Sequence, residues 1–220
     1  MKAAKHLLVT LAAVIVCLMP LAAQSETLEE TRAKAEQGDA DALFNLGVRY
    51  ANGNGVVKNE AEAVNWYLKA AEQGHAEAQF FLGCCYYSGK GVVKNVAETV
   101  KWFRKSAEQG FAMAQVILGM HYSQGVGLEK NEAEAFEWFG KAAEQGLARA
   151  QECLGHCYAE GKSVVKNDLL AYQWYLLASA NGIATVRENL PALEAKLTAE
   201  QRAEGQRLAT EWQAEFKKRH

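Results

Sequence analysis

Residues 82–110 have the sequence LGCCYYSGKGVVKNVAETVKWFRKSAEQG, and near copies of this stretch recur every 36 residues, four times in all. Each copy holds a Gly-x-x-Tyr motif, a loop glycine, a Lys-Asn pair, a tryptophan followed by an aromatic residue, and a closing glycine. Self-similarity at a fixed period of this length is typical of a solenoid, in which no single repeat can bury its own apolar face. Because solenoids usually serve as binding surfaces, the repetition favours a binding protein over an enzyme.

The first half of this copy predicts a helix that stops near Ser88. Ala78, Leu82 and Tyr86 fall on one helical face, and the glycines that follow break the pattern. Gly83 lies beside that face and has no side chain, so it should let the following helix approach closely. Replacing Gly83 by leucine should therefore force the helical layers apart.

The second half predicts a second helix that ends at Gly110. Asn95 is well placed as its N-cap, and Glu98 three residues later completes a capping-box pattern. The same pairing occurs as Asn59 with Glu62 and as Asn131 with Glu134, whereas the last copy has lost the glutamate.

The predicted fold class is all-α, a single-domain αα-solenoid superhelix of helix pairs. The expected parts are a signal peptide (1–23), a lone helix (24–39), four repeats (40–75, 76–111, 112–147 and 148–183) and C-terminal capping helices (184–220). Pro191 replaces the expected glycine in the first capping helix. Thr198 and Gln201 should cap a polar last helix whose Trp212 covers the open end of the array.

Residues 1–23 have the layout of a secretory signal peptide. A short basic start precedes an uncharged apolar run, and small residues up to Ala23 offer a cleavage site. We therefore expect a periplasmic or secreted protein whose mature chain does not insert into a membrane. Losing Lys2 and Lys5 lowers the basic count from 24 to 22, against 26 acidic residues, and this mildly acidic balance argues against nucleic acid as the partner.

Export implies an oxidising compartment, so the four cysteines of the mature chain need an explanation. Cys84-Cys85 and the pair Cys153 and Cys157 lie two repeats apart, roughly 15–20 Å if each helical layer adds about 8–10 Å, which is beyond disulfide reach. We expect mostly free, packed thiols. Cys153, His156 and Cys157 have a spacing that could present ligands to zinc or copper, but only three ligands are available locally, so we expect no metal and no cofactor.

The motif Leu-Gly-x-x-Tyr-x-x-Gly-x-Gly-Val, seen at residues 46–56, and Ala-x-x-Trp-Tyr-x-x-Ala-Ala-x-x-Gly, seen at residues 63–74, resemble the Sel1-like repeat. The resemblance covers residues from about 39 to 183 and implies a superhelix similar to tetratricopeptide arrays. It also implies an adaptor function. Exported cysteine-rich members of the family, some with a β-lactamase or penicillin-binding label, have a cysteine pair in each repeat. Here the corresponding positions, such as Ala71 and Ala78, are not cysteine, so that label does not carry over.

If the array resembles tetratricopeptide repeats, the first helix of each repeat lines a concave face. Four rows of positions should then point outward, apolar at the N-terminal end and acidic near the fourth repeat. An apolar groove with a polar rim is a plausible binding surface for a peptide or helix. The predicted binding residues are Phe44, Val48, Phe80, Cys84, Tyr87, Val116, Met120, Glu152, His156 and Glu160. The alternative is that tight curvature buries some of these positions as core.

Ser163-x-x-Lys166 matches the nucleophile motif of serine β-lactamases, but the stretch is the loop of the repeat, with Ser163 in place of glycine. Lys58, Lys94, Lys130 and Lys166 should form a row of solvated lysines along one edge.

The sequence thus predicts a non-catalytic scaffold that binds a protein or peptide through its concave face, with an unknown oligomeric state. The alternatives are an envelope enzyme of the β-lactamase or penicillin-binding kind and a thiol- or metal-handling protein.

Overall fold

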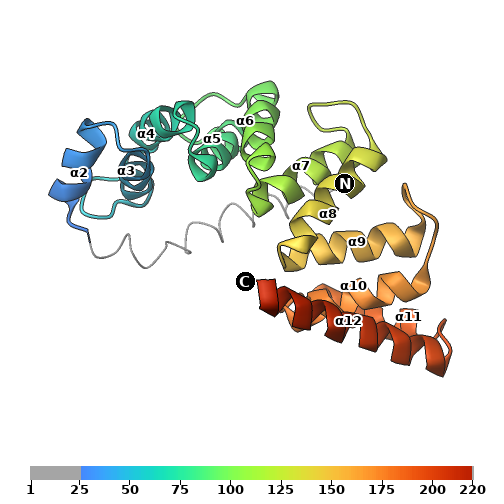
Figure 1. Cartoon of the computed structure of the whole chain (residues 1–220). Helices are drawn as coiled ribbons and strands as arrows, with labels where there is room; N and C mark the ends of the chain where they lie inside the picture. Colours follow the sequence, from blue (N-terminus) through green and yellow to red (C-terminus); the bar gives the residue numbers. More distant parts are fainter. Residues whose placement is uncertain (1–25, 220) are drawn as a thin grey trace. The chain divides into compact units, whose positions relative to one another are not determined.

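The computed structural model describes residues 26–219, which form eleven α-helices and no β-strand (Figure 1). The described residues divide into two compact units, 26–109 and 110–219. The first unit holds α2 (Leu28–Glu36), α3 (Ala40–Asn52), α4 (Glu60–Glu72), α5 (Ala76–Ser88) and α6 (Val96–Glu108). The second holds α7 (Ala112–Gln124), α8 (Glu132–Glu144), α9 (Ala148–Glu160), α10 (Asp168–Ala180), α11 (Ala184–Glu194) and α12 (Ala199–Arg219). The predicted all-α class is confirmed, and the predicted signal peptide, 1–23, lies outside the described residues.

Each repeat is a pair of 13-residue helices, and within each unit the pairs pack in series. Asparagine caps the second helix of every pair, as predicted: the Asn95 side chain accepts a hydrogen bond from the backbone N–H of Glu98. The predicted reciprocal half of the capping box is wrong, because the N–H of Asn95 donates instead to the carbonyl of Tyr86, 3.1 Å away. The backbone carbonyl of Tyr86, the tyrosine of the Gly-x-x-Tyr motif, thus joins the end of α5 to the start of α6. The Glu98 carboxylate pairs with Lys101 instead.

The first helix of each pair ends in a left-handed glycine, at Gly53, Gly89, Gly125 and Gly161. A second loop glycine with positive φ follows two residues later in the first three repeats, and the fourth repeat has Ser163 there, with a φ of 60°. Ser163 is the one non-glycine residue with positive φ among residues 26–219. L-residues are strained in this conformation, so the fourth loop carries a local cost that the other three avoid.

We predict that Ser163→Gly raises the free energy of unfolding by about 0.5–1 kcal/mol. The relief of left-handed strain, about 1–2 kcal/mol, exceeds the extra chain entropy that glycine adds to the unfolded state. Urea unfolding followed by circular dichroism measures the change. Ser163→Ala is the matched control, since it removes the hydroxyl and keeps the strain, and an equal gain in both variants would contradict the explanation.

The glycine of the Gly-x-x-Tyr motif sets the distance between the two helices of a pair. A Cβ placed on Gly83 would lie 2.7 Å from the Phe103 ring, closer than real Cβ contacts permit. Gly47, Gly119 and Gly155 meet the equivalent rings in the same way. The predicted close approach is confirmed, and the aromatic residue after each tryptophan is what fills the space.

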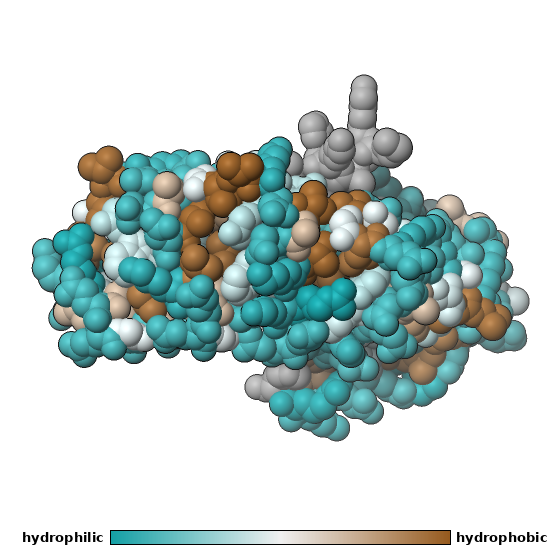
Figure 2. Space-filling model, turned by 90° about the horizontal axis from the view of Figure 1, so that it is seen from above, coloured by the Kyte–Doolittle hydropathy of each residue, from teal (hydrophilic) through white to brown (hydrophobic). Residues whose placement is uncertain are grey.

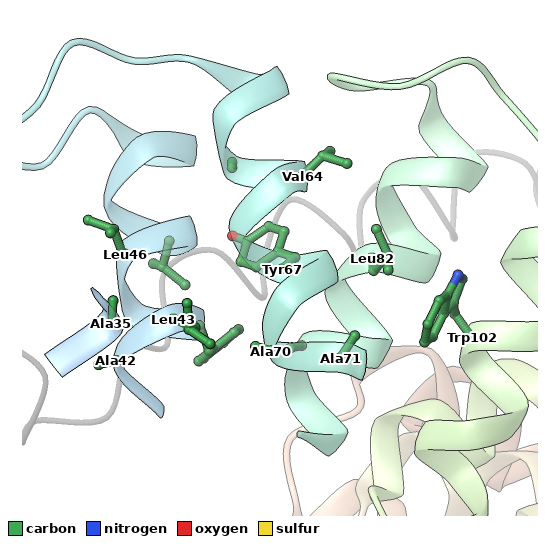
Figure 3. Packing of buried hydrophobic residues seen from close by; sticks show 14 residues of the cluster. Ala35, Ala42, Leu43, Leu46, Val64, Tyr67, Ala70, Ala71, Leu82 and Trp102 are labelled. Atoms are coloured by element: carbon green, nitrogen blue, oxygen red, sulfur yellow. The ribbon is translucent and has the colours of Figure 1, made fainter. Parts of the chain in front are cut away.

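The core of the first unit lies between these helices. Leu46 from α3, Tyr67 from α4 and Leu82 from α5 are almost fully buried, and small residues such as Ala70 pack between them (Figure 3). In the second unit, Tyr172 and Tyr175 from α10 pack with Leu193 and Leu197 from the C-terminal part.

Glutamine side chains fasten the two helices of a repeat to each other and to the preceding repeat. Gln109, which follows α6, donates from its side-chain amide to the Gln79 side-chain oxygen at 2.7 Å, and Gln79 donates to the carbonyl of Ala71 in the preceding repeat at 3.0 Å. Gln145 bonds Gln115 at 2.9 Å in the same way. Sequence reasoning missed this element, although the recurring Ala-x-Ala-Gln at the start of the first helices is its signal.

The C-terminal helices α11 and α12 pack on α10, the second helix of the fourth repeat. Thr198 and Gln201 cap α12 with two reciprocal hydrogen bonds. Trp212 contacts Trp174 edge to face, with ring centroids 6.0 Å apart. Gly205, which the sequence did not single out, repeats the helix-spacing role, because a Cβ there would lie 2.6 Å from the ring of Tyr172.

Within residues 26–219, no helix combines the length and the hydropathy that a membrane span requires.

Candidate binding surface

Three of the predicted binding residues in the first unit belong to its core. Phe44, Val48 and Phe80 are 5%, 7% and 1% exposed. The Phe44 ring stacks on His75, the N-cap of α5, at a centroid distance of 4.9 Å and lies 5.4 Å from Phe81 of the next repeat. The prediction that these side chains point outward is wrong, because this side of the first helix faces the following helix pair.

The same correction applies to Val116, Met120 and Glu152 in the second unit, which are 1%, 9% and 5% exposed. Glu152 replaces the apolar residue of the other repeats and brings a carboxylate into the interior. It is paired with Arg149 and accepts a hydrogen bond from the Thr185 hydroxyl at 2.7 Å. Buried carboxylates persist when they are paired and hydrogen-bonded in this way, so Glu152 joins α9 to α11.

Four predicted residues keep accessible surface. Cys84 and Tyr87 are half-buried in the first unit, and His156 and Glu160 are exposed in the second. The His156 ring nitrogen Nδ1 lies 2.9 Å from the Tyr175 hydroxyl, and a hydrogen bond from Lys162 lowers the pKa of Glu160. Contact between these four residues and a partner stays a prediction.

The four cysteines that the structure describes are free thiols; Cys157 is buried and the other three are partly buried. Burial raises the pKa of Cys85 and Cys153 to about 12 and that of Cys157 to about 11, and it raises the pKa of Cys84 as well. The thiolate is the form that attacks electrophiles and binds soft metals. Among residues 26–219, no three histidine, cysteine or acidic side chains group closely enough to hold a metal ion.

We predict that Cys84, Cys85, Cys153 and Cys157 react slowly with iodoacetamide at about pH 8. With pKa values near 11–12, about 0.1% or less of each thiol is ionised at that pH. Alkylation mapped by mass spectrometry, before and after denaturation, should show labelling at least about tenfold slower in the folded protein. Fast labelling at any of the four sites in the folded state would contradict this account of the thiols.

Ser163 and Lys166 both lie in the loop before α10, and Lys166 pairs with Asp168 at 3.8 Å. A serine β-lactamase needs its serine at the start of a helix with the lysine one turn later. This loop does not provide that arrangement.

The loops carry an apolar feature that sequence reasoning missed. Val57, Val93 and Val165, the second valines of the loop motif, are 88%, 85% and 89% exposed, whereas the first valines are partly covered. Two consecutive valines cannot both face the core, and this is the signal the sequence offered. On the face seen from above, hydrophobic surface forms separate patches within largely hydrophilic surroundings (Figure 2).

In three of the four repeats the loop lysine pairs with an acid that begins the following helix. Lys58 contacts Glu60 at 3.7 Å, and Lys130 contacts Glu132 at 2.7 Å. In the second repeat the acidic position holds Val96, which is 45% exposed. The loop lysines are exposed, as predicted, and Lys58, Lys130 and Lys166 keep 55–60% of their side-chain surface accessible beside their acidic partners.

Residues 40–75, 76–111, 112–147 and 148–183 each match the family model of the Sel1 repeat. The chain belongs to the Sel1 repeat family. This confirms the resemblance and the solenoid class, and Sel1 repeats generally act as non-catalytic scaffolds that mediate protein interactions. Among curated proteins, no sequence matches this chain.

Two solved Sel1 repeat structures are similar to it. One is c5321, a protective antigen of uropathogenic Escherichia coli with an SLR fold, at 39% identity and a TM-score of 0.76 over 84% of this chain. The chain spans only 40% of that protein. The other is a Sel1 repeat protein from Oxalobacter formigenes, at 37% identity and a TM-score of 0.70, covering 80% of this chain and 75% of that one.

Proposed function

We propose that this Sel1 repeat protein is a non-catalytic scaffold that binds a protein or peptide, and that it works in the periplasm or outside the cell. The observation that carries the proposal is the exposure of Val57 and Val93 on the loops of the first unit, at 88% and 85%. The folded units do not use these side chains, because the loop is already held to its helix by the first valine and the tyrosine carbonyl. Apolar side chains repeated at one edge suit contact with another molecule.

Affinity capture from an envelope extract tests this function. A captured protein is identified, purified and titrated against the full chain by calorimetry. We expect saturable binding with a defined stoichiometry. If no purified candidate binds in a saturable way, the scaffold proposal fails.

The export part of the proposal has a separate test. Expression in a bacterial host, followed by fractionation and N-terminal sequencing, should give a periplasmic chain that starts at Gln24, after cleavage at Ala23. A chain that keeps Met1 in the cytosolic fraction would contradict export.

The absence of catalysis is tested with a chromogenic β-lactam. Wild-type protein and Ser163→Ala should both show only the background rate. Hydrolysis by the wild type that the variant loses would overturn the non-catalytic assignment.

A further inference from the structure

The loop edge of the first unit holds a patch that differs from the same edge elsewhere in the chain. Val57, Val93 and Val96, here named the valine patch, are 88%, 85% and 45% exposed. The two loops that carry them are neighbours, because the backbone at Gly91 lies so close to the start of α4 that a Cβ there would be 2.1 Å from the Glu60 carbonyl oxygen. Val93 follows Gly91 by two residues, and Val57 precedes Glu60 by three.

The surroundings of the valine patch are basic. Lys58, Lys90 and Lys94 are exposed. Glu60 pairs with Lys58, and Glu98, two residues after Val96, pairs with Lys101. Elsewhere the residue two positions after the loop lysine is Glu60, Glu132 or Asp168, and after Lys94 it is Val96. The second repeat has thus exchanged an acid for an apolar side chain, which leaves an excess of lysine around three exposed valines.

We propose that the valine patch binds an acidic protein segment whose carboxylates alternate with aliphatic side chains. The inference rests on the proposed scaffold function and names the partner class and the site. The aliphatic side chains cover Val57, Val93 and Val96, and the carboxylates face Lys90 and Lys94. Complementary charge of this kind selects the partner and speeds association.

Two other occupants fit the patch less well. A two-fold contact with a second copy would place Lys90 and Lys94 of both copies against one another, because such an interface pairs a surface with itself. Binding to an anionic membrane usually relies on clusters of about four to eight basic residues or on aromatic anchors. The valine patch has three lysines around it, and its own side chains are aliphatic.

A random peptide library displayed on phage, selected on the full-length protein, tests the proposal. We expect enriched peptides to be acidic and aliphatic, and synthetic copies to bind. Their Kd should weaken about tenfold or more for V57S/V93S/V96S and for K90E/K94E, since truncating anchor residues at an interface has effects of this size. V165S, at the same loop position of the second unit and equally exposed, is the matched control and should bind like the wild type.

Several results overturn the site. These are selected peptides that lack acids, peptides whose affinity survives the triple serine change, and binding that V165S weakens as much as V57S/V93S/V96S. If the wild type self-associates in sedimentation and V57S/V93S/V96S does not, the occupant is a second copy of the chain. If the wild type is retained on phosphatidylglycerol vesicles and V57S/V93S/V96S is not, the occupant is a membrane. Circular dichroism of every variant confirms that the fold is kept.

The site and the scaffold function fail in different ways. If the partner obtained by affinity capture binds V57S/V93S/V96S as tightly as the wild type, the valine patch is excluded and the scaffold function stands. If neither capture nor selection yields a saturable ligand, the scaffold function itself falls.

Discussion

Gly119→Leu is expected to lower the free energy of unfolding by about 3 kcal/mol or more, a large share of the stability of an ordinary domain. A Cβ at Gly119 would lie 2.7 Å from the Phe139 ring and 3.2 Å from the carbonyl oxygen of Ala135. The ring is itself buried, and the second contact is backbone, so α8 as a whole must move away from α7. Denaturant unfolding measured by circular dichroism and tryptophan fluorescence gives the change.

Gly140→Leu is the matched control within the same unit. Gly140 also lies in a helix, α8, but a Cβ there would meet nothing within 4 Å. Leucine has the higher helix propensity, so this variant should be neutral or more stable by about 0.5–1 kcal/mol. Equal losses at the two positions would show that helix spacing is not what Gly119 provides.

Gly91→Ala is expected to lower the free energy of unfolding by about 3 kcal/mol, which is several times the usual effect of adding one methyl group. The added Cβ would lie 2.1 Å from the Glu60 carbonyl oxygen and 2.4 Å from its carbonyl carbon, so the backbone of the loop and of α4 must separate. Gly91 also has a φ of 69°, which alanine adopts at a cost of about 1–2 kcal/mol. Thermal and urea unfolding measure the loss.

Gly55→Ala separates these two causes. Gly55 occupies the same position in the first repeat with a φ of 77°, yet the nearest atoms to its Cβ would be 3.9 Å away. The free energy of unfolding of Gly55→Ala should therefore fall only by the cost of the left-handed backbone conformation, about 1 kcal/mol. If both variants lost the same amount, contact between the second loop and α4 would contribute nothing to stability.

Local elements of this protein follow from local sequence. The asparagine N-caps and the left-handed glycines act on backbone groups a few residues away, so their identity and spacing were enough to predict most helix ends. The prediction of a capping box at Asn95 was wrong because of another local hydrogen bond. The Asn95 N–H has two possible acceptors, and the sequence does not show that the Tyr86 carbonyl reaches it first.

The candidate surface depended on contacts between repeats, which helical periodicity alone does not supply. Phe44 and Glu152 occupy equivalent positions, and both are buried. Phe44 packs against Phe81 of the next repeat. Glu152 pairs with Arg149 and accepts a hydrogen bond from Thr185. Val57 is apolar, yet it is 88% exposed, and Val56 is the partly buried residue of this valine pair.

By itself, the sequence determined that the chain is a series of helix pairs with Sel1 repeats, because a repeated motif encodes the same local hydrogen bonds and the same glycine-to-ring contact each time. The tertiary structure alone decided which side chains are accessible. Burial depends on how far one helix pair covers the next, and that cover is set by packing between side chains of different repeats, such as Phe44 and Phe81.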